Sequence, residues 1–238
     1  TAPGGECAVI RAAHSGWPRG DNSLLKLLEF FYEQLPTMFA TRAADCRSAA
    51  DILITRGPVR STVFMLQHTP PEALLDTNGY AAGTAFHTAA EKGSEKMWRE
   101  ISAADCIPPA AFTAVNSQGM TVLHTAIAAN NCAAVSFLLD RMDSATILLQ
   151  DIRGYGPLHT LVDATAAPRN GPVHPDNVWD TAALVIGAVP TAAFGQRNGG
   201  HLTTPAFAGL TPSELAAAHG LDALAAALQP RVKGTIAS

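Results

Sequence analysis

Three histidines recur at nearly equal spacing in the middle of the chain and are the first candidates for chemistry. His87, His124 and His159 are separated by 37 and 35 positions. Imidazole is a common metal ligand, so a column of such side chains would be a candidate metal ladder. A structural role competes with this interpretation, because neighbouring helical units pack about 10 Å apart, too far for two imidazoles to share one ion. We therefore predict that the histidines are structural and that the chain binds no metal.

The other chemistry-bearing residues do not form a recognisable catalytic or cofactor motif. Gly154-Tyr155-Gly156 matches the opening of a dinucleotide-binding loop, but the third glycine is missing and no strand of any length precedes it. Neither a phosphate-binding G-x-x-x-x-G-K-[ST] loop nor a G-x-S-x-G nucleophile motif occurs. The arrangement of cysteine, histidine and aspartate nominates no nucleophile with its base. We expect no catalytic residue and no cofactor.

The four cysteines are too widely separated to form a metal-binding pair. They are Cys7, Cys46, Cys106 and Cys132. None belongs to a C-x-x-C motif, and none has a histidine at zinc-finger spacing. A chain of this size does not need a disulfide framework. The pattern favours buried free thiols and a reducing intracellular location, which we expect to be the cytoplasm.

Composition and charge narrow the class of protein. Of the 238 residues, 47% are hydrophobic, 15% are charged and 6% are aromatic, which excludes a disordered chain and favours closely packed short helices. The net charge is −4 and lysine and arginine do not cluster, so we expect no nucleic-acid partner. The longest apolar run, 181–195, is too short for a membrane span and is interrupted by Pro190. We therefore expect no membrane partner.

An internal repeat defines the elements that would position these residues. From Gly119 the sequence reads Gly-Met-Thr-Val-Leu-His-Thr-Ala, and related sequences surround His87 and His159. A later copy has Glu214 at the histidine position. When weaker copies are included, the anchor positions are Ile10, Asp51, His87, His124, His159 and Glu214.

Each copy encodes the same succession of elements. The anchor lies in a short helix, and a second apolar helix follows; in the clearest copy Val135, Leu138 and Leu139 fall on one face of it. Between the two helices, glycine or asparagine recurs six residues after the anchor, and these residue types end helices in the left-handed conformation. The helix-ending residues are Gly16, Gly57, Gly93, Asn130 and Gly220. The sequence therefore predicts repeated units of turn, short helix, tight turn and longer helix.

This pattern resembles the ankyrin repeat, whose signature is a glycine, Thr-Pro-Leu-His, an alanine pair and a second glycine, repeated about every 33 residues. The resemblance covers residues 5–229; the units around His87, His124 and His159 are specific, and the first two and the last are degenerate. It implies an all-α solenoid of about six stacked helix-turn-helix units, with short turns or hairpins between them and each histidine hydrogen-bonded to turn backbone. The expected units of a single domain, 1–238, are approximately 5–40, 46–75, 78–112, 116–148, 151–190 and 206–229.

The spacing of the last two units departs from the repeat. His159 and Glu214 are 55 positions apart, about 20 more than the period requires. We place the additional residues in two inserts, 163–177 and 190–209. Proline and glycine predict that the first insert is a non-helical surface loop, and the Asn-Gly-Gly sequence at Asn198 predicts that the second is a lengthened hairpin or a mobile tip. Long loops often carry function, and a tolerated insertion is the competing interpretation.

The resemblance also implies a partner-binding surface, formed by the turn tips and by the exposed side of the first helices along a concave face. Tyrosine, methionine and arginine are residue types favoured at interface hot spots, whereas ordinary solvated turn residues are the competing interpretation. The candidate partner-binding residues are Tyr80, Glu91, Lys92, Ser117, Gln118, Met120, Arg153 and Tyr155. Replacing Arg153 and Tyr155 with alanine is expected to cut affinity at least about tenfold without lowering the melting temperature.

We therefore expect a protein-protein interaction module that binds a protein or peptide partner and is monomeric on its own. An alternative is the targeting or substrate-recognition module of a larger enzyme whose catalytic domain lies outside these residues. The chain begins at Thr1 without a methionine or a signal-peptide pattern, which is compatible with a fragment. A scaffold or self-associating module is a third interpretation.

Overall fold

Helix pairs follow one another along the chain and are divided between two units. The computed structural model describes residues 7–15, 21–77, 83–167, 175–199 and 207–229. The first unit is Thr1–Ser117 and the second is Gln118–Ser238. Both are helical, and the described residues contain no β-strand, only one isolated antiparallel bridge between Arg42 and Ser48. The expected all-α fold is confirmed.

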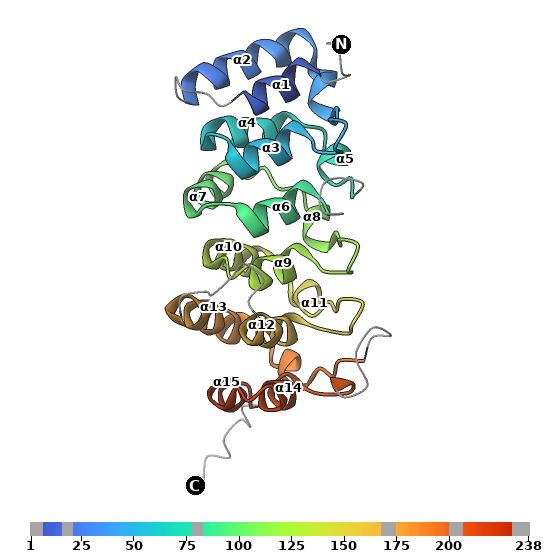
Figure 1. The fold of residues 1–238 in the computed structure, drawn as a ribbon, viewed down its shortest axis with the longest axis vertical. Helices are drawn as coiled ribbons and strands as arrows, with labels where there is room; N and C mark the ends of the chain where they lie inside the picture. Colours follow the sequence, from blue (N-terminus) through green and yellow to red (C-terminus); the bar gives the residue numbers. More distant parts are fainter. Residues whose placement is uncertain (1–6, 16–20, 78–82, 168–174, 200–206, 230–238) are drawn as a thin grey trace. The chain divides into compact units, whose positions relative to one another are not determined.

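The first unit contains three helix pairs that stack in chain order (Figure 1). The helices are α1 (Ala8–His14) with α2 (Asp21–Gln34), α3 (Ala49–Arg56) with α4 (Val59–His68), and α6 (Ala85–Lys92) with α7 (Glu95–Ala104). α1 packs on α3 and α3 on α6, while α2 packs on α4 and α4 on α7. The first helices of successive pairs therefore form one layer and the second helices another, as stacked repeats require.

The second unit repeats this arrangement with three further pairs. They are α9 (Val122–Ala128) with α10 (Cys132–Arg141), α12 (Pro157–Ala166) with α13 (Pro175–Ala188), and α14 (Pro212–Ala218) with α15 (Asp222–Ala227). α9 packs on α12 and α12 on α14, while α10 packs on α13. Each predicted pair of helices is therefore present where the repeat places it.

A short helix that the sequence did not predict follows each of the first five pairs. These helices are η1 (Pro36–Ala40), α5 (Pro71–Leu74), α8 (Ala110–Thr113), α11 (Ser144–Ile147) and η3 (Thr191–Gly195). Each buries at least one apolar side chain, for example Phe39 in η1 and Ile147 in α11. The connections between pairs are therefore part of the core, because burying these side chains anchors the chain before the next turn.

Small side chains allow the helices of each unit to approach closely. In the first unit, Ala49 and Ala50 of α3 and Ala89 and Ala90 of α6 are almost fully buried. Larger aliphatic and aromatic side chains from the second helices and connections complete this core. They include Leu24, Leu28, Phe39, Met65, Trp98 and Ile101. Trp98 is 2% exposed, so it lies on the core face of α7.

Four of the first helices begin with the same reciprocal cap, which explains the recurring residues around the anchor. A serine or threonine hydroxyl accepts the backbone N–H of the anchor residue, whose side chain accepts the N–H of that serine or threonine. The pairs are Ser48 with Asp51, Thr84 with His87, Thr121 with His124, and Thr211 with Glu214. Aspartate and glutamate can replace histidine at the anchor because each supplies the required acceptor.

Only two of the described helix-ending residues adopt the left-handed conformation that we expected. Asn130 and Gly220 have φ of 56° and 71°. Gly57 and Gly93 are instead extended, with φ of −84° and −67°, so the expectation is wrong for them. A Cβ atom on Gly57 would lie 2.7 Å from the carbonyl oxygen of Leu53. Glycine is needed there because the chain passes close to the last turn of α3, not because φ is positive.

The first insert is helical at both of its ends. Residues 163–166 belong to α12 and residues 175–177 to α13, so the expectation that 163–177 is non-helical is wrong at both ends. Pro175 is tolerated because the first helical position needs no N–H donor. The part of this insert at 168–174 lies outside the described residues.

The second insert begins with η3 and continues as the base of a hairpin. The N–H of Asn198 donates to the carbonyl of Leu210, and the N–H of Gly209 donates to the carbonyl of Asn198, each at 3.0 Å. These two bonds pair Asn198 with Gly209 and Leu210, as is expected at the base of a hairpin. Residues 200–206 of this insert lie outside the described residues.

Cys46 occupies a turn position at which the copies anchored at His124, His159 and Glu214 have glycine. It lies five residues before its anchor and has a positive φ of 65°. Gly119, Gly154 and Gly209 stand at the same position in their copies and have φ of 69° to 75°. A left-handed conformation costs a residue with a Cβ atom about 1–2 kcal/mol. Cys46→Gly is therefore expected to raise the free energy of unfolding by about 0.5–1 kcal/mol, after the greater freedom of glycine in the unfolded chain is subtracted.

Urea unfolding of the parent chain and of Cys46→Gly measures this difference in the free energy of unfolding. The matched control is Ala44→Gly, two residues earlier in the same exposed turn, where φ is not positive. This change should be neutral or destabilising. Equal effects of the two substitutions would show that Cys46 is not strained.

Candidate functional site

The histidines hold turns to helices, as the resemblance predicted. The imidazole of fully buried His124 accepts the N–H of Thr121 at Nδ1, 3.2 Å away, and donates from Nε2 to the carbonyl of Tyr155 at 3.0 Å. Nδ1 of His87 accepts the N–H of Thr84 at the same distance. Both nitrogens of His124 and Nδ1 of His87 therefore bond to backbone groups. Among the described residues, no three His, Cys, Asp or Glu side chains are placed to hold a metal ion.

His159 keeps only half of this arrangement. Its Nε2 donates to the carbonyl of Leu210 at 3.0 Å, but Gly156 stands where the other units have serine or threonine, and α12 has no side-chain cap. Nδ1 is buried and has no hydrogen-bond partner among the described residues. The amide of Gln196 occupies the space beside Gly156, so a side chain there would overlap it. Burial lowers the pKa of His159, although the bond to Leu210 opposes this shift.

Acidification is therefore expected to destabilise the second unit through His159. A histidine whose pKa is lower in the folded than in the unfolded state contributes full stability above the unfolded pKa of about 6.5. That stability is lost, by up to about 1.4 kcal/mol per pH unit, as the pH falls from this value toward the folded pKa. Thermal unfolding at pH 7.5, 6.5 and 5.5 tests this. The decrease should be smaller in His159→Asn, and identical decreases in both proteins would exclude His159 as its source.

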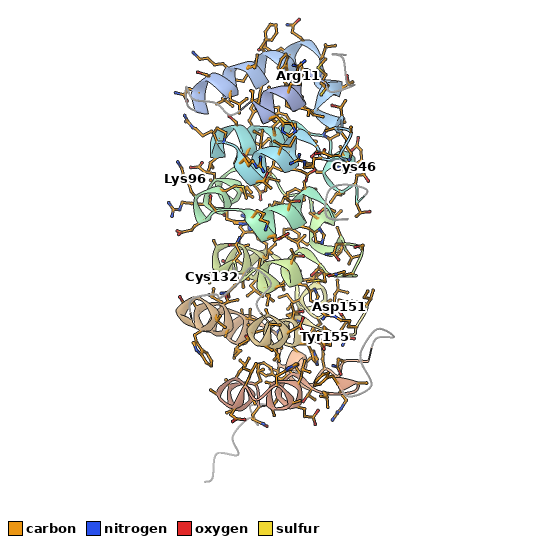
Figure 2. The ribbon with its side chains drawn as sticks, viewed as in Figure 1. Arg11, Cys46, Lys96, Cys132, Asp151 and Tyr155 are labelled. Carbon is orange, nitrogen blue, oxygen red and sulfur yellow. The ribbon has the colours of Figure 1, made fainter. Side chains whose placement is uncertain are left out.

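Arg153 and Tyr155 lie together in the turn before α12, but they stabilise that turn instead of facing solvent. The buried carboxylate of Asp151 accepts the backbone N–H groups of Arg153 and Tyr155 at 2.8 and 2.9 Å. The guanidinium of Arg153 lies 3.0 Å from Asp151 and 3.1 Å from Asp163, and 4.1 Å above the ring of Tyr155. Figure 2 labels Asp151 and Tyr155 in this turn.

Two of the predicted partner-binding residues are buried, which corrects the expected surface. Tyr155 is 6% exposed and stacks on His159, and Met120 is 2% exposed. The repeat places both one residue after the turn glycine, where the chain re-enters the core to begin the first helix. Neither side chain is available as an exposed anchor. The expectation that alanine at Arg153 and Tyr155 would leave the melting temperature unchanged is inconsistent with these contacts.

The other predicted residues that the structure describes are exposed or half-buried, and their contact with a partner stays a prediction. Ser117, Gln118 and Lys92 are exposed. Glu91 is half-buried, and its carboxylate lies 2.8 Å from the ammonium of Lys92. Tyr80 lies outside the described residues.

The four cysteines are free thiols, but none of them is fully buried. Cys46 is exposed, and Cys7, Cys106 and Cys132 are half-buried, so the expectation of buried thiols is wrong. Burial nevertheless raises the pKa of the Cys106 thiol to about 11. That thiol is therefore protonated and poorly nucleophilic at neutral pH.

None of the described helices is both long enough and apolar enough to cross a membrane.

A cavity lies between the first helices of the first unit, and the repeat pattern of the sequence did not predict it. Its volume is about 290 Å³. The rim residues His14 and Arg56 are exposed, so the cavity is reachable from solvent. Its wall is formed by α1, by α3 with the turn before it, and by the start of α4. The lining includes Ala13, His14, Arg47, Ile52, Arg56 and Pro58.

The polar part of this cavity is basic. His14, Arg47 and Arg56 line it, and no carboxylate is among the described lining residues. Arg56 is the last residue of α3, and Lys92 is the last residue of α6, so basic residues recur at this position. Basic side chains favour the C-terminal end of a helix because they complement its dipole, which is why the pattern alone did not indicate a site.

Comparison with known proteins identifies the fold. Neither a protein-family model nor a curated protein sequence matches the chain. Three solved structures do match: an ankyrin repeat domain from Acinetobacter baumannii AYE, the ankyrin repeat protein EF0377, and the ankyrin repeat domain of Bcl-3, a member of the IκB protein family. Their TM-scores are 0.60, 0.64 and 0.56 at sequence identities of 15%, 14% and 18%. The matches cover 92%, 96% and 93% of this chain and 94%, 98% and 99% of those chains. The chain therefore has the fold of an ankyrin-repeat domain.

Proposed function

We propose that this chain is a protein-protein interaction module that binds a peptide segment of its partner on the first helices of the first unit. The observation that carries the proposal is the cavity between α1 and α3, which is reachable from solvent and which no described side chain fills. A groove between stacked helices suits an extended segment, because several side chains of that segment can contact successive repeats.

The distribution of polar residues supports binding as the function. His87, His124 and His159, whose imidazoles are suited to acid-base chemistry, bond instead to the backbone of caps and turns. Lys92, Ser117 and Gln118, by contrast, are exposed and are retained as candidate contacts. We therefore assign a binding function to the chain and no catalytic step.

A displayed library of random dodecapeptides, selected against the intact chain, tests this function. We expect enrichment of peptides that bind the folded chain but not the heat-unfolded chain. Hydrogen exchange measured with an enriched peptide should slow in residues 11–15 and 47–58, which surround the cavity. Failure to enrich any peptide, or protection confined to other segments, would contradict the proposal.

A further inference from the structure

We propose that the cavity between α1 and α3 recognises an acidic side chain, the carboxylate of an aspartate or glutamate in the bound peptide. This inference rests on the proposed function and adds the chemistry of the partner to it. Three lines of observation support it: the charge of the rim, the apolar character of the floor and the size of the cavity.

The rim offers positive charge that the protein does not fully neutralise. Arg56 is exposed and makes no ion pair with any described residue. Arg47 lies 2.5 Å from Asp45, which is outside the lining of the cavity. Hydrogen bonds from Arg47 lower the pKa of Asp45, and the charge of His14 contributes to the same shift. Asp45 pairs with Arg47, whereas Arg56 has no acidic partner among the described residues, and a carboxylate bound in the cavity would supply one.

Arginine is well suited to this role, and a further arginine extends the positive surface. A guanidinium donates two parallel hydrogen bonds to one carboxylate, which gives both strength and orientation. Arg11 is exposed on α1, one turn before His14, and Figure 2 labels it there. The chain as a whole carries a net charge of −4, so this local excess of positive charge opposes the overall balance.

The floor and the volume match one side chain of a peptide. Ala13 and Ile52 are buried, and together with Pro58 they form an apolar surface for the methylene groups of an acidic residue. A volume of about 290 Å³ is at the lower end of the range of about 300–1,000 Å³ that small-molecule sites span. The cavity is therefore too small for a large cofactor and suits a single inserted side chain.

Binding of fluorescein-labelled hexaglutamate, compared with hexaglutamine, tests the inference. Fluorescence anisotropy with the intact chain should show tighter binding of hexaglutamate. Arg56→Glu should weaken it at least about tenfold, because a charge-assisted hydrogen bond is lost and a repulsion replaces it. The matched control is Lys96→Glu, the same charge reversal at an exposed position of α7 outside the cavity, which should change binding less than about twofold.

Thermal unfolding of both variants establishes that they remain folded before binding is compared. Equal binding of the two peptides, or equal weakening by the two variants, would overturn the inference, because attraction would then depend on overall charge. Inorganic phosphate is added as a competitor. Displacement of hexaglutamate by phosphate at equal concentration would indicate a free-anion site and would overturn the assignment to a peptide.

The peptide library separates this inference from the function on which it rests. Enriched peptides that carry aspartate or glutamate and lose affinity for Arg56→Glu support both. Enriched peptides without acidic residues, or with unchanged affinity for Arg56→Glu, overturn the inference but leave peptide binding in place. An empty selection contradicts the proposed function, whereas the hexaglutamate measurement still decides whether the cavity prefers carboxylates.

Discussion

Replacing Tyr155 with alanine is expected to lower the free energy of unfolding of the second unit by about 3 kcal/mol. Tyr155 is only 6% exposed, and its ring contacts both the imidazole of His159 and the guanidinium of Arg153. Alanine would leave a cavity at this position and remove both ring contacts. Urea unfolding monitored by circular dichroism measures the loss.

Two further variants distinguish the ring from the rest of the turn. Tyr155→Phe keeps both stacking contacts and should cost less than about 1.5 kcal/mol. Arg153→Ala leaves the buried carboxylate of Asp151 without its cation, although two backbone N–H groups still donate to it, and should cost about 1–3 kcal/mol. A Tyr155→Ala protein as stable as the parent chain would show that this residue is a surface residue, as register had predicted.

Replacing Gly57 with alanine is expected to cost about 2–3 kcal/mol, the second large effect. The new methyl group would lie 2.7 Å from both the Cα atom and the carbonyl oxygen of Leu53. These are backbone atoms in the last turn of α3, so the overlap cannot be relieved by a side-chain rotation. The helix end or the link to α4 must shift instead, and α3 packs on both α1 and α6. Thermal and urea unfolding measure the effect.

Gly220→Ala provides the matched comparison, because this glycine also ends a first helix but is favoured there by its positive φ. Its φ is 71°, but a Cβ atom there would have no neighbour within 4 Å. Alanine at Gly220 should therefore cost only the left-handed strain, about 1–2 kcal/mol. A larger cost at Gly220 than at Gly57 would show that φ, and not close approach, selects glycine between the helices of each pair.

Local sequence was sufficient to predict the helices, because their signals are carried by neighbouring residues. The cap of α9 needs only Thr121 and His124, which are three positions apart, and the apolar face of α10 needs only a helical period. The recurrence of the same motif at a regular interval also predicted that the helix pairs stack. The short helices between pairs were missed because four or five residues carry too little periodicity to be recognised.

The candidate surface was predicted less well, because the exposure of a side chain depends on which other elements pack against it. Tyr155 and Met120 were selected as residue types common in interfaces, yet aromatic and thioether side chains are also those that a core buries most readily. The sequence did not predict a site at His14 and Arg56, since a basic residue is common at the C-terminal end of a helix. They become a candidate site only when α1 and α3 lie side by side.

By itself, the sequence determined the all-α class, the number and order of helix pairs and the structural role of the histidines. These properties follow from interactions within about ten residues, repeated along the chain. Only the tertiary structure decided that the turn before α12 is held by Asp151 and Asp163, that Gly57 relieves a backbone contact, and that basic residues from two pairs share one cavity. The physical reason is that burial, backbone approach and local charge balance are set by residues brought together from separate elements, whose distances no local pattern encodes.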